Sequence, residues 1–335
     1  MKKVRLLLAS VLLISLIALA ACGSDNDNNN NNDTDNTNTE EPGNNNENGN
    51  DNNNDNNNAD NNGDNDGNND GETGKLDELR EAGVVHVGFA DEKPYGYENE
   101  DGELTGASVD TAKAVFKELG IDEVEGHLAD YSQLVPGLGA GKFDAITSGM
   151  AITPDRCEEA AFAEPDMKYG EGLIVQKGNP LDLHSYEDIA DNPDATVSIM
   201  SGATEVDFVQ SEGVDEDQIQ DASDIPGTIA AVQSGRADAT TGTEMTLIDA
   251  LESADSDDLE FVEDFEQPDI DGVPSYGAVA FHPDNQDLLD AFNEKLAELK
   301  EDGTIAEILE DNGFDAERNW PDDDVTAEMV CNGEE

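Results

Sequence analysis

Short apolar runs rich in β-branched residues alternate with amphipathic runs of helical length from residue 84 onward. The run VVHVGFA at 84–90 precedes a predicted helix at 108–119, and a strand-like run at 196–200 precedes a predicted helix at 224–234. Strands that alternate with helices build α/β folds, in which helices cover a mostly parallel sheet. We therefore expect an α/β fold with largely parallel sheets.

The alternating pattern occurs twice, which predicts two α/β lobes. Strand-like runs at 171–177 and 276–282 stand between the two sets, so we expect the chain to cross between the lobes twice. This division assigns 75–175 and 278–335 to lobe 1, and 176–277 to lobe 2. A cleft between two lobes is a common place for a small-molecule site.

The first residues have the layout of an export signal. Basic residues precede an apolar run at 6–21, which is short for a membrane span and ends in LAAC at Cys22. This ending resembles a bacterial lipobox, and the resemblance implies cleavage before Cys22 and a lipid on its sulfur. We expect residues 1–22 to be a lipoprotein signal peptide. The protein would then be lipid-anchored on the extracellular face of the cell membrane, in the periplasmic space if the source has an outer membrane. An ordinary signal peptide with a chance cysteine is the alternative.

Residues 23–74 consist almost wholly of Asn, Asp, Gly, Thr and Glu and contain no Val, Ile, Leu, Phe, Tyr or Trp. A segment without these side chains cannot form a hydrophobic core, so we expect a disordered tether. A flexible chain of this length spans roughly 40 Å, and charge repulsion extends it further. Calcium binding by its Asp residues is a weaker alternative, because the segment lacks the EF-hand loop pattern.

Acidic residues far outnumber basic ones in the part of the chain that can fold. Residues 75–335 contain 66 acidic and 13 basic side chains. So large a negative charge excludes nucleic acid as a partner. It also destabilises the folded state by self-repulsion at low salt, and molar salt screens that repulsion because the Debye length falls to about 3 Å. We expect a source organism that lives at high salt.

Three cysteines are present, Cys22, Cys157 and Cys331. If Cys22 carries the lipid, the other two remain as a pair in an exported protein, where disulfides form. We expect a disulfide between Cys157 and Cys331 that fixes the C-terminal tail beside Arg156. Two free thiols are the alternative.

Four polar or aromatic side chains follow the ends of predicted strands. Glu92 and Tyr95 come after the strand at 84–90, and Tyr131 and Arg156 come after the next two strands. Ligands of parallel sheets bind beyond the carboxyl ends of the strands, so we expect all four side chains at one rim.

Arg156 lies in the stretch GMAITPDRC, in which Thr153 suits a helix N-cap and Pro154 the first helical position. An arginine beside a helix N-terminus, past the end of a strand, suits a bidentate grip on a ligand carboxylate. The alternative is an ion pair with one of the many acidic side chains nearby.

Several motifs, taken in order, resemble a known family. GFADEKPYGY, PGLGAGKFDAITSGMAITPDRC and QSGRADATTGT are similar to segments of the polar-amino-acid family of extracellular solute-binding proteins, the receptors of ABC importers. The stretch KGNPLDLHSYEDIA and the two late cysteines bring the resemblance closer to the branch that binds ectoine and hydroxyectoine. The resemblance covers about residues 84–332. It implies a type II periplasmic-binding-protein fold, a ligand cleft that closes between two lobes, and ABC permease subunits as partners.

The resemblance also implies the ligand contacts. Arg156 belongs to the T-P-x-R motif that binds the ligand carboxylate, and Thr204 in the loop SGATE assists from the second lobe. Glu92 matches an acid that hydrogen-bonds the ring nitrogens of ectoine, while Tyr95 and Tyr131 match aromatic rings whose faces attract its cation. We expect a monomer that captures ectoine or hydroxyectoine and needs no cofactor or metal ion.

Two positions depart from the family pattern. Ala151 stands where the ectoine-binding branch has an aromatic residue, and this removes one wall around the ligand. Thr243 stands where many amino-acid binders have an Asp for the α-ammonium group, which argues against an ordinary amino acid.

Other functions stay open at this point. A polar amino acid or a betaine is the alternative ligand on the same fold, and a sensor role is an alternative to import. An enzyme on this fold is a more remote alternative, because the histidines are scattered and neither a metal-ligand spacing nor a nucleophile motif occurs.

Overall fold

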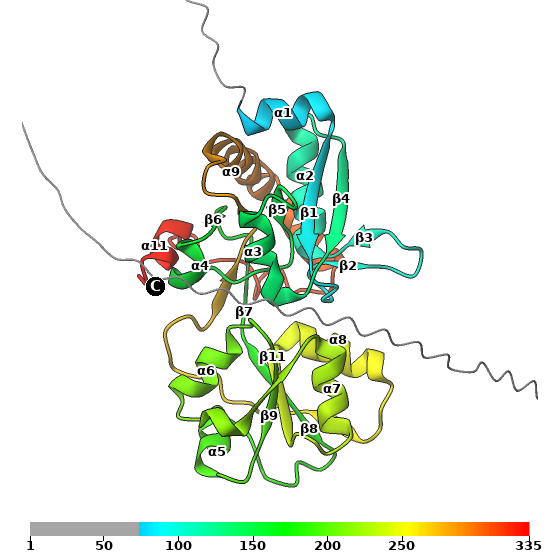
Figure 1. The fold of residues 1–335 in the computed structure, drawn as a ribbon, viewed down its shortest axis with the longest axis vertical. Helices are drawn as coiled ribbons and strands as arrows, with labels where there is room; N and C mark the ends of the chain where they lie inside the picture. Colours follow the sequence, from blue (N-terminus) through cyan, green and yellow to red (C-terminus); the bar gives the residue numbers. More distant parts are fainter. Residues whose placement is uncertain (1–73, 335) are drawn as a thin grey trace, which may run out of the picture. The chain divides into compact units, whose positions relative to one another are not determined.

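Two five-stranded sheets organise residues 74–334, the part of the chain described by a computed structural model (Figure 1). The predicted signal peptide, Cys22 and the predicted tether through residue 73 lie outside the described residues. No helix within residues 74–334 is long and apolar enough to cross a membrane. Each sheet carries its own helices, and the chain therefore has the two α/β lobes that the alternating pattern predicts.

Lobe 1 is built on the sheet with strand order β4-β1-β5-β14-β6. The strands are β1 (Val84–Phe89), β4 (Glu123–Leu128), β5 (Ala145–Ile146), β6 (Ala161–Phe162) and β14 (Ala280–Phe281). The helices are α1 (Lys75–Ala82), α2 (Ala107–Glu118), α3 (Leu134–Gly139), α4 (Pro154–Cys157), α9 (Gln286–Glu301), α10 (Thr304–Asp311) and α11 (Ala327–Cys331). A hairpin of β2 (Tyr97–Glu98) and β3 (Leu104–Thr105) and a 3₁₀ turn, η1 (Tyr131–Gln133), complete it.

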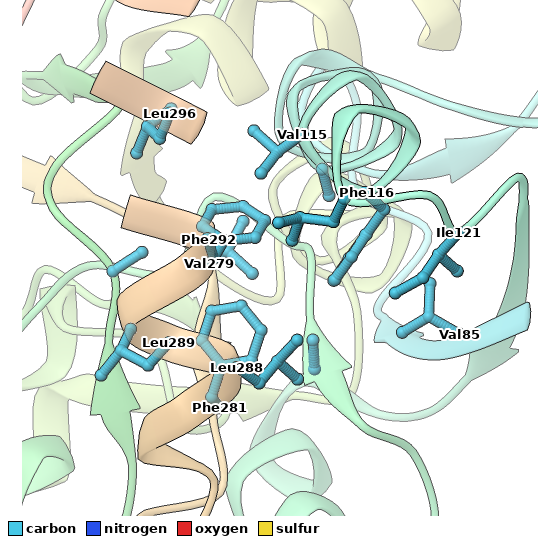
Figure 2. Close-up of a cluster of buried hydrophobic side chains, with 14 of the residues drawn as sticks. Val85, Val115, Phe116, Ile121, Val279, Phe281, Leu288, Leu289, Phe292 and Leu296 are labelled. Carbon is cyan, nitrogen blue, oxygen red and sulfur yellow. The ribbon is translucent and has the colours of Figure 1, made fainter. Parts of the chain in front are cut away.

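The core of lobe 1 lies where α2 and α9 pack beside β1 and β14 (Figure 2). Helix α9 buries Leu288, Phe292 and Leu296, which recur at helical spacing and face inward together. The ring of Phe292 packs edge-on against Phe116 and Phe281, at centroid distances of 5.4 and 5.1 Å. This dry cluster makes lobe 1 a rigid platform for the loops at its strand ends.

Lobe 2 is built on the sheet with strand order β10-β9-β11-β8-β12. The strands are β8 (Glu171–Gln176), β9 (Val197–Met200), β10 (Ile219–Ala222), β11 (Ala239–Thr243) and β12 (Leu259–Phe261). The helices are α5 (Tyr186–Asp191), α6 (Glu205–Ser211), α7 (Ile225–Gln233) and α8 (Glu244–Ala254), with a 3₁₀ turn, η2 (Glu216–Gln218). Two clusters of buried aliphatic side chains pack against this sheet.

The chain crosses between the lobes through a pair of antiparallel strands, β7 (Met167–Tyr169) and β13 (Ser275–Gly277). The predicted change of lobe after residue 175 falls inside β8, whose residues pair with β11 and β12 of lobe 2. The change of sheet therefore lies between β7 and β8, around Gly170.

The predicted parallel arrangement holds for four strands of each sheet but not for the fifth. In lobe 1, β14 runs antiparallel to both its neighbours, and in lobe 2, β8 does the same. The chain enters the sheet of lobe 2 through β8 and returns to the sheet of lobe 1 through β14. The alternation of strands and helices predicts parallel strands only where a helix connects them. No helical crossover precedes β8 or β14, so the sequence pattern could not predict that these two strands run antiparallel.

Cys157 and Cys331 form a disulfide with a Cα–Cα distance of 5.7 Å. The bond joins the end of α4 to the end of α11, which pack against each other (Figure 1). The C-terminal helix is thus fixed beside the short helix that carries Arg156.

Candidate functional site

A small cavity with a volume of about 20 Å³ lies where the two lobes meet. Lobe 1 and the first crossing contribute Glu92, Tyr95, Tyr131, Ser148, Gly149, Ala151 and Tyr169 to its lining. Lobe 2 contributes Met200, Ala203, Thr204, Glu205 and Thr243. Wider, more open cavities lie beside it and share Arg156, Thr204 and Glu92. This lining combines one buried acid from each lobe with the rings of three tyrosines, so we place the candidate site here.

Glu92 follows β1 and is 8% exposed. Its carboxylate Oε1 accepts a hydrogen bond of 2.7 Å from the Thr246 hydroxyl of lobe 2. The pKa of Glu92 is raised to about 7, chiefly by burial. The hydrogen bond from Thr246 and the charge of Arg156 lower this pKa, and the charge of Glu205 raises it. A buried carboxylate of this kind gains from a cation placed beside it, since the cation offsets the cost of desolvation.

A second acidic group faces the cavity from lobe 2. Glu205, the first residue of α6, is 4% exposed, and burial raises its pKa. Behind it Glu171 is also buried, and burial and the nearby Glu205 raise its pKa well above the ordinary value. The Tyr186 hydroxyl donates to Oε2 of Glu171 over 3.4 Å. No Lys, Arg or His is among the described residues that line the cavity, so its interior favours a positively charged ligand.

Aromatic rings form one wall of the cavity. The rings of Tyr95 and Tyr169 meet edge to face with centroids 5.4 Å apart. The Tyr169 hydroxyl donates to the Gly149 carbonyl over 2.6 Å. Gly149 has a φ of +56°, and a Cβ there would lie 2.2 Å from the Tyr95 ring, so only glycine permits this wall.

Arg156 lies at the edge of the cavity rather than in its lining. Its backbone N–H donates to the Thr153 hydroxyl, the helix N-cap that the sequence predicts. Its guanidinium Nη1 donates to the Ala151 carbonyl over 2.8 Å, and Nη2 donates to the Gly202 carbonyl of lobe 2 over 3.0 Å. The guanidinium carbon lies 5.6 Å from the centroid of the Tyr131 ring.

The ion pair considered as an alternative for Arg156 is absent, since no carboxylate of residues 74–334 lies within ion-pair distance of its guanidinium. An arginine has five N–H donors, and two carbonyl bonds leave several for a ligand. The role of Arg156 as carboxylate ligand remains a prediction.

The structure brings most of the predicted site residues together. Glu92, Tyr95, Tyr131 and Thr204 all line the cavity, and Arg156 adjoins it. Within residues 74–334 no group of three or more His, Cys, Asp or Glu side chains is arranged to hold a metal ion.

Among the polar and aromatic residues of the lining, sequence reasoning missed Ser148, Tyr169 and Glu205. The Ser148 hydroxyl is buried and has no hydrogen-bond partner among the described residues, so it is available to a ligand. Ser148 follows β5 closely and Glu205 follows Thr204, so proximity to predicted site residues could have indicated both. Nothing in the local sequence marks Tyr169, which belongs to a crossing strand.

Comparison with known proteins places the chain in a family. The profile of the family described as bacterial extracellular solute-binding proteins, family 3, matches residues 85–313. A "probable amino-acid ABC transporter periplasmic-binding protein" of Sinorhizobium fredii is 35% identical over 260 residues, which are 76% of this chain and 85% of the relative.

Solved structures extend the likeness to the fold. The crystal structure of EhuB in complex with hydroxyectoine is 35% identical, with a TM-score of 0.70, and the match covers 77% of this chain and 97% of that one. An ancestral arginine-binding protein bound to arginine is 28% identical, with a TM-score of 0.60 and coverage of 69% and 98%. The fold is thus the type II periplasmic-binding-protein fold, as expected, and the family consists of transport proteins rather than enzymes.

The matched region and the two-lobed fold support the same family assignment. The chain belongs to family 3 of the bacterial extracellular solute-binding proteins, the receptors that bind amino acids or related small molecules for the permease subunits of ABC importers.

Proposed function

We propose that this receptor captures ectoine and hydroxyectoine in the interlobe cavity. The observation that carries the proposal is the lining itself, in which two buried carboxyl groups and three tyrosines occur without a basic side chain. Ectoine joins a carboxylate to a delocalised cyclic amidinium. Carboxylates and tyrosine faces suit that diffuse cation, and each tyrosine contributes about 0.5–2 kcal/mol depending on desolvation.

The two acids approach the ligand from opposite lobes. Glu92 belongs to lobe 1 and Glu205 belongs to lobe 2. The cationic ring of the ligand, with its N–H groups, can therefore contact both carboxyl groups only when the lobes are closed. The ligand carboxylate is directed to the edge where the Arg156 guanidinium lies over the Tyr131 ring. This division of charge supports a zwitterion over a simple anion.

Tyr169 supplies the wall that Ala151 lacks. Ala151 and Tyr169 belong to one buried cluster with Tyr95, and all three line the cavity. A tyrosine from the crossing strand can therefore enclose the ligand where the ectoine-binding branch uses an aromatic residue at the position of Ala151. The neighbouring hydroxyectoine-bound structure supports the same ligand class.

The proposal includes an anchored receptor in a salt-loving organism. A lipid on Cys22 and the Asn- and Asp-rich tether would hold the two lobes outside the membrane within reach of the permease. Mass spectrometry of the mature chain tests this part, because it predicts an N-terminal lipid-modified Cys22; an unmodified chain with a longer or shorter N-terminus would contradict it.

A cationic amino acid such as arginine is the second candidate. The presence of two buried acids in one cavity favours it, because arginine carries two positive groups beside one carboxylate. The arginine-bound ancestral structure belongs to the same family of folds. Against it, Thr243 offers only a hydroxyl where many amino-acid binders place an acid.

Isothermal titration calorimetry on the purified protein separates the candidates. The ligand set is ectoine, hydroxyectoine, arginine, glutamine and glycine betaine, each titrated at the same high salt concentration. We expect the two ectoines to bind tightest. Clear heat from an amino acid or the betaine, with none from either ectoine, would refute the proposed ligand while leaving the receptor assignment intact.

A further inference from the structure

The last residue of β11 and the first turn of α8 belong to lobe 2, yet four consecutive residues there, Thr243–Thr246, contact lobe 1. The Tyr95 hydroxyl donates to Thr243 Oγ1 over 2.9 Å. The Thr246 hydroxyl donates to Glu92 Oε1 over 2.7 Å. Two proposed ligand-binding residues of lobe 1 are therefore bonded directly to this turn.

The two middle residues of the turn, Glu244 and Met245, also contact lobe 1. The Arg318 guanidinium donates to Oε2 of Glu244. Met245 packs against the cluster that contains Tyr95 and Phe314. Each of the four residues Thr243–Thr246 therefore contacts lobe 1, which makes this turn a continuous point of contact between the lobes.

Arg318 is held in position by a rigid segment of lobe 1. Its neighbour Asn319 is buried and exchanges two hydrogen bonds with the backbone of Lys168 in β7, of 2.8 and 3.0 Å. Asp315 accepts from the Arg318 backbone N–H over 3.1 Å. These hydrogen bonds fix the backbone around Arg318, from which the guanidinium extends to Glu244.

The Arg318–Glu244 pair is asymmetric in exposure. The Glu244 side chain is 9% exposed, whereas that of Arg318 is 65% exposed. Burial raises the pKa of Glu244, and the charge of Arg318 partly offsets that rise. Removing Arg318 leaves a buried carboxylate without its cation, and we expect opening of the lobes to relieve that cost.

Arginines are scarce in this chain, and half of those that the structure describes join the lobes. Arg80 bonds the Leu119 carbonyl within lobe 1, and Arg236 bonds the Ser234 hydroxyl within lobe 2. Arg156 and Arg318 instead reach lobe 2 from lobe 1. Arg156 lies at the edge of the cavity, whereas Arg318 is not one of the residues that line it.

We propose that Arg318 and Glu244 form a clasp that holds the lobes closed and sets how long a bound ligand stays. The proposal concerns the same site and rests on the proposed function only for the identity of the ligand. Arg318 does not touch the ligand. It acts by favouring the closed arrangement, in which Thr246 orients Glu92 toward the cavity.

A clasp of this kind has a kinetic signature. The clasp stabilises the closed arrangement both with and without ligand, and a ligand enters while the lobes are open. Loss of the clasp therefore does not slow association, but it increases the dissociation rate. The apparent affinity falls with the population of the closed state. For one charge-assisted bond to a buried carboxylate with a partly exposed donor, we expect a change of about 5- to 10-fold.

The test compares Arg318→Gln with Arg236→Gln in the full chain. Both variants remove one exposed arginine, but only the first removes a contact between the lobes. Small-angle X-ray scattering without added ligand measures the separation of the lobes, and stopped-flow fluorescence of Trp320, the sole tryptophan of the sequence, measures the binding rates. Arg318→Lys tests partial rescue by charge, and Arg318→Gln in a Glu244→Gln background tests whether the two residues act together.

We expect Arg318→Gln to increase the radius of gyration and the ectoine dissociation rate, with Arg236→Gln like wild type and little further change in the Glu244→Gln background. An unchanged radius of gyration in Arg318→Gln would overturn the clasp, whatever happens to affinity. So would a slower association rate with unchanged dissociation. If the wild-type protein binds no ectoine, the proposed ligand fails, while the scattering comparison still decides the clasp.

Discussion

Under the proposed function, Glu92 couples the charge of the ligand to the protonation of the protein. Its carboxyl group is buried between Thr246 and the cavity, with Glu205 and Arg156 as the charged groups that influence it most. Its pKa of about 7 means that the site holds a substantial fraction of neutral Glu92 near neutral pH. A cation beside the ionised form would lower that pKa, so binding and ionisation favour each other.

Ligand affinity should therefore rise with pH. As the pH increases from about 5.5 to about 8.5, Glu92 ionises in the free protein, and the dissociation constant for ectoine is expected to fall by about tenfold or more. Calorimetry across this range measures it. Glu92→Gln is the matched control and should bind weakly with a flatter profile; a wild-type affinity independent of pH would remove Glu92 from the ligand contacts.

The stability of the ligand-free protein should respond to Glu92 in the opposite direction. A carboxyl group whose pKa is raised from 4.5 to about 7 on folding contributes stability that is fully present below pH 4.5 and is lost as the pH rises through about 7. Glu92→Gln should accordingly lose less stability than wild type between these pH values. Urea unfolding at several pH values checks this, and parallel curves for the two proteins would contradict it.

Arg156 should contribute binding energy at the carboxylate end of the ligand. Arg156→Ala is expected to weaken ectoine binding by at least about a hundredfold, because it removes a charge-assisted donor and its stacking on Tyr131. Arg236→Ala, which removes an arginine far from the cavity, should bind like wild type. Equal affinity in the two variants would exclude Arg156 from the site.

Ala151→Phe should weaken ectoine binding, although it restores the aromatic residue of the ectoine-binding branch. Ala151 is buried in the cluster that contains Tyr95 and Tyr169, so a phenylalanine there competes for the cavity volume. The double variant Ala151→Phe with Tyr169→Ala should recover part of the loss. Tighter binding in Ala151→Phe alone would show that Tyr169 does not form the missing wall. Calorimetry on the three proteins provides the comparison.

At the scale of elements, the covalent link between α4 and α11 is the feature with the clearest consequence. The disulfide closes a segment with a sequence separation of 174 residues, and α11 buries Ala327 and Val330 against lobe 1. The link restricts the unfolded chain and also holds the helix that carries Arg156.

Replacing both Cys157 and Cys331 by alanine should lower the free energy of unfolding by about 2–4 kcal/mol. Guanidinium denaturation at fixed salt measures the change, and reduction of the wild-type protein should reproduce it. An unaltered midpoint in both experiments would show that the bond contributes nothing to stability in solution.

The sequence predicts elements well where the information is local. The strand after α1 and the helices α2, α7, α9 and α10 follow from apolar periodicity and glycine stops, and Glu92, Tyr95 and Tyr131 follow because each comes after a strand end. The reversed strands β8 and β14 and the wall made by Tyr169 depend on how the chain crosses between lobes. Contacts such as Thr246 to Glu92 join residues 154 positions apart, and no local pattern contains them.

At the scale of the whole molecule, negative charge determines the conditions under which the fold is stable. The excess of acidic residues over basic ones in 75–335 is spread over both lobes, so self-repulsion acts on folding and on lobe closure together.

Raising sodium chloride from about 0.1 M to about 2 M should increase the melting temperature, because salt screens this repulsion. Differential scanning calorimetry measures the effect, and potassium chloride should act similarly if screening is the cause. A melting temperature that falls as salt is raised would contradict a high-salt origin.

The central claim is that a zwitterion with a diffuse cation is enclosed between one acid from each lobe and the tyrosines of lobe 1 and the first crossing. A crystal structure of the protein with hydroxyectoine, grown at high salt, tests it most directly. The account predicts the ring between Glu92 and Glu205 beside Tyr95 and Tyr131, with the ligand carboxylate on the Arg156 guanidinium. A ligand bound outside this cavity, or a carboxylate with Arg156 still engaged only with the Ala151 and Gly202 carbonyls, would contradict it.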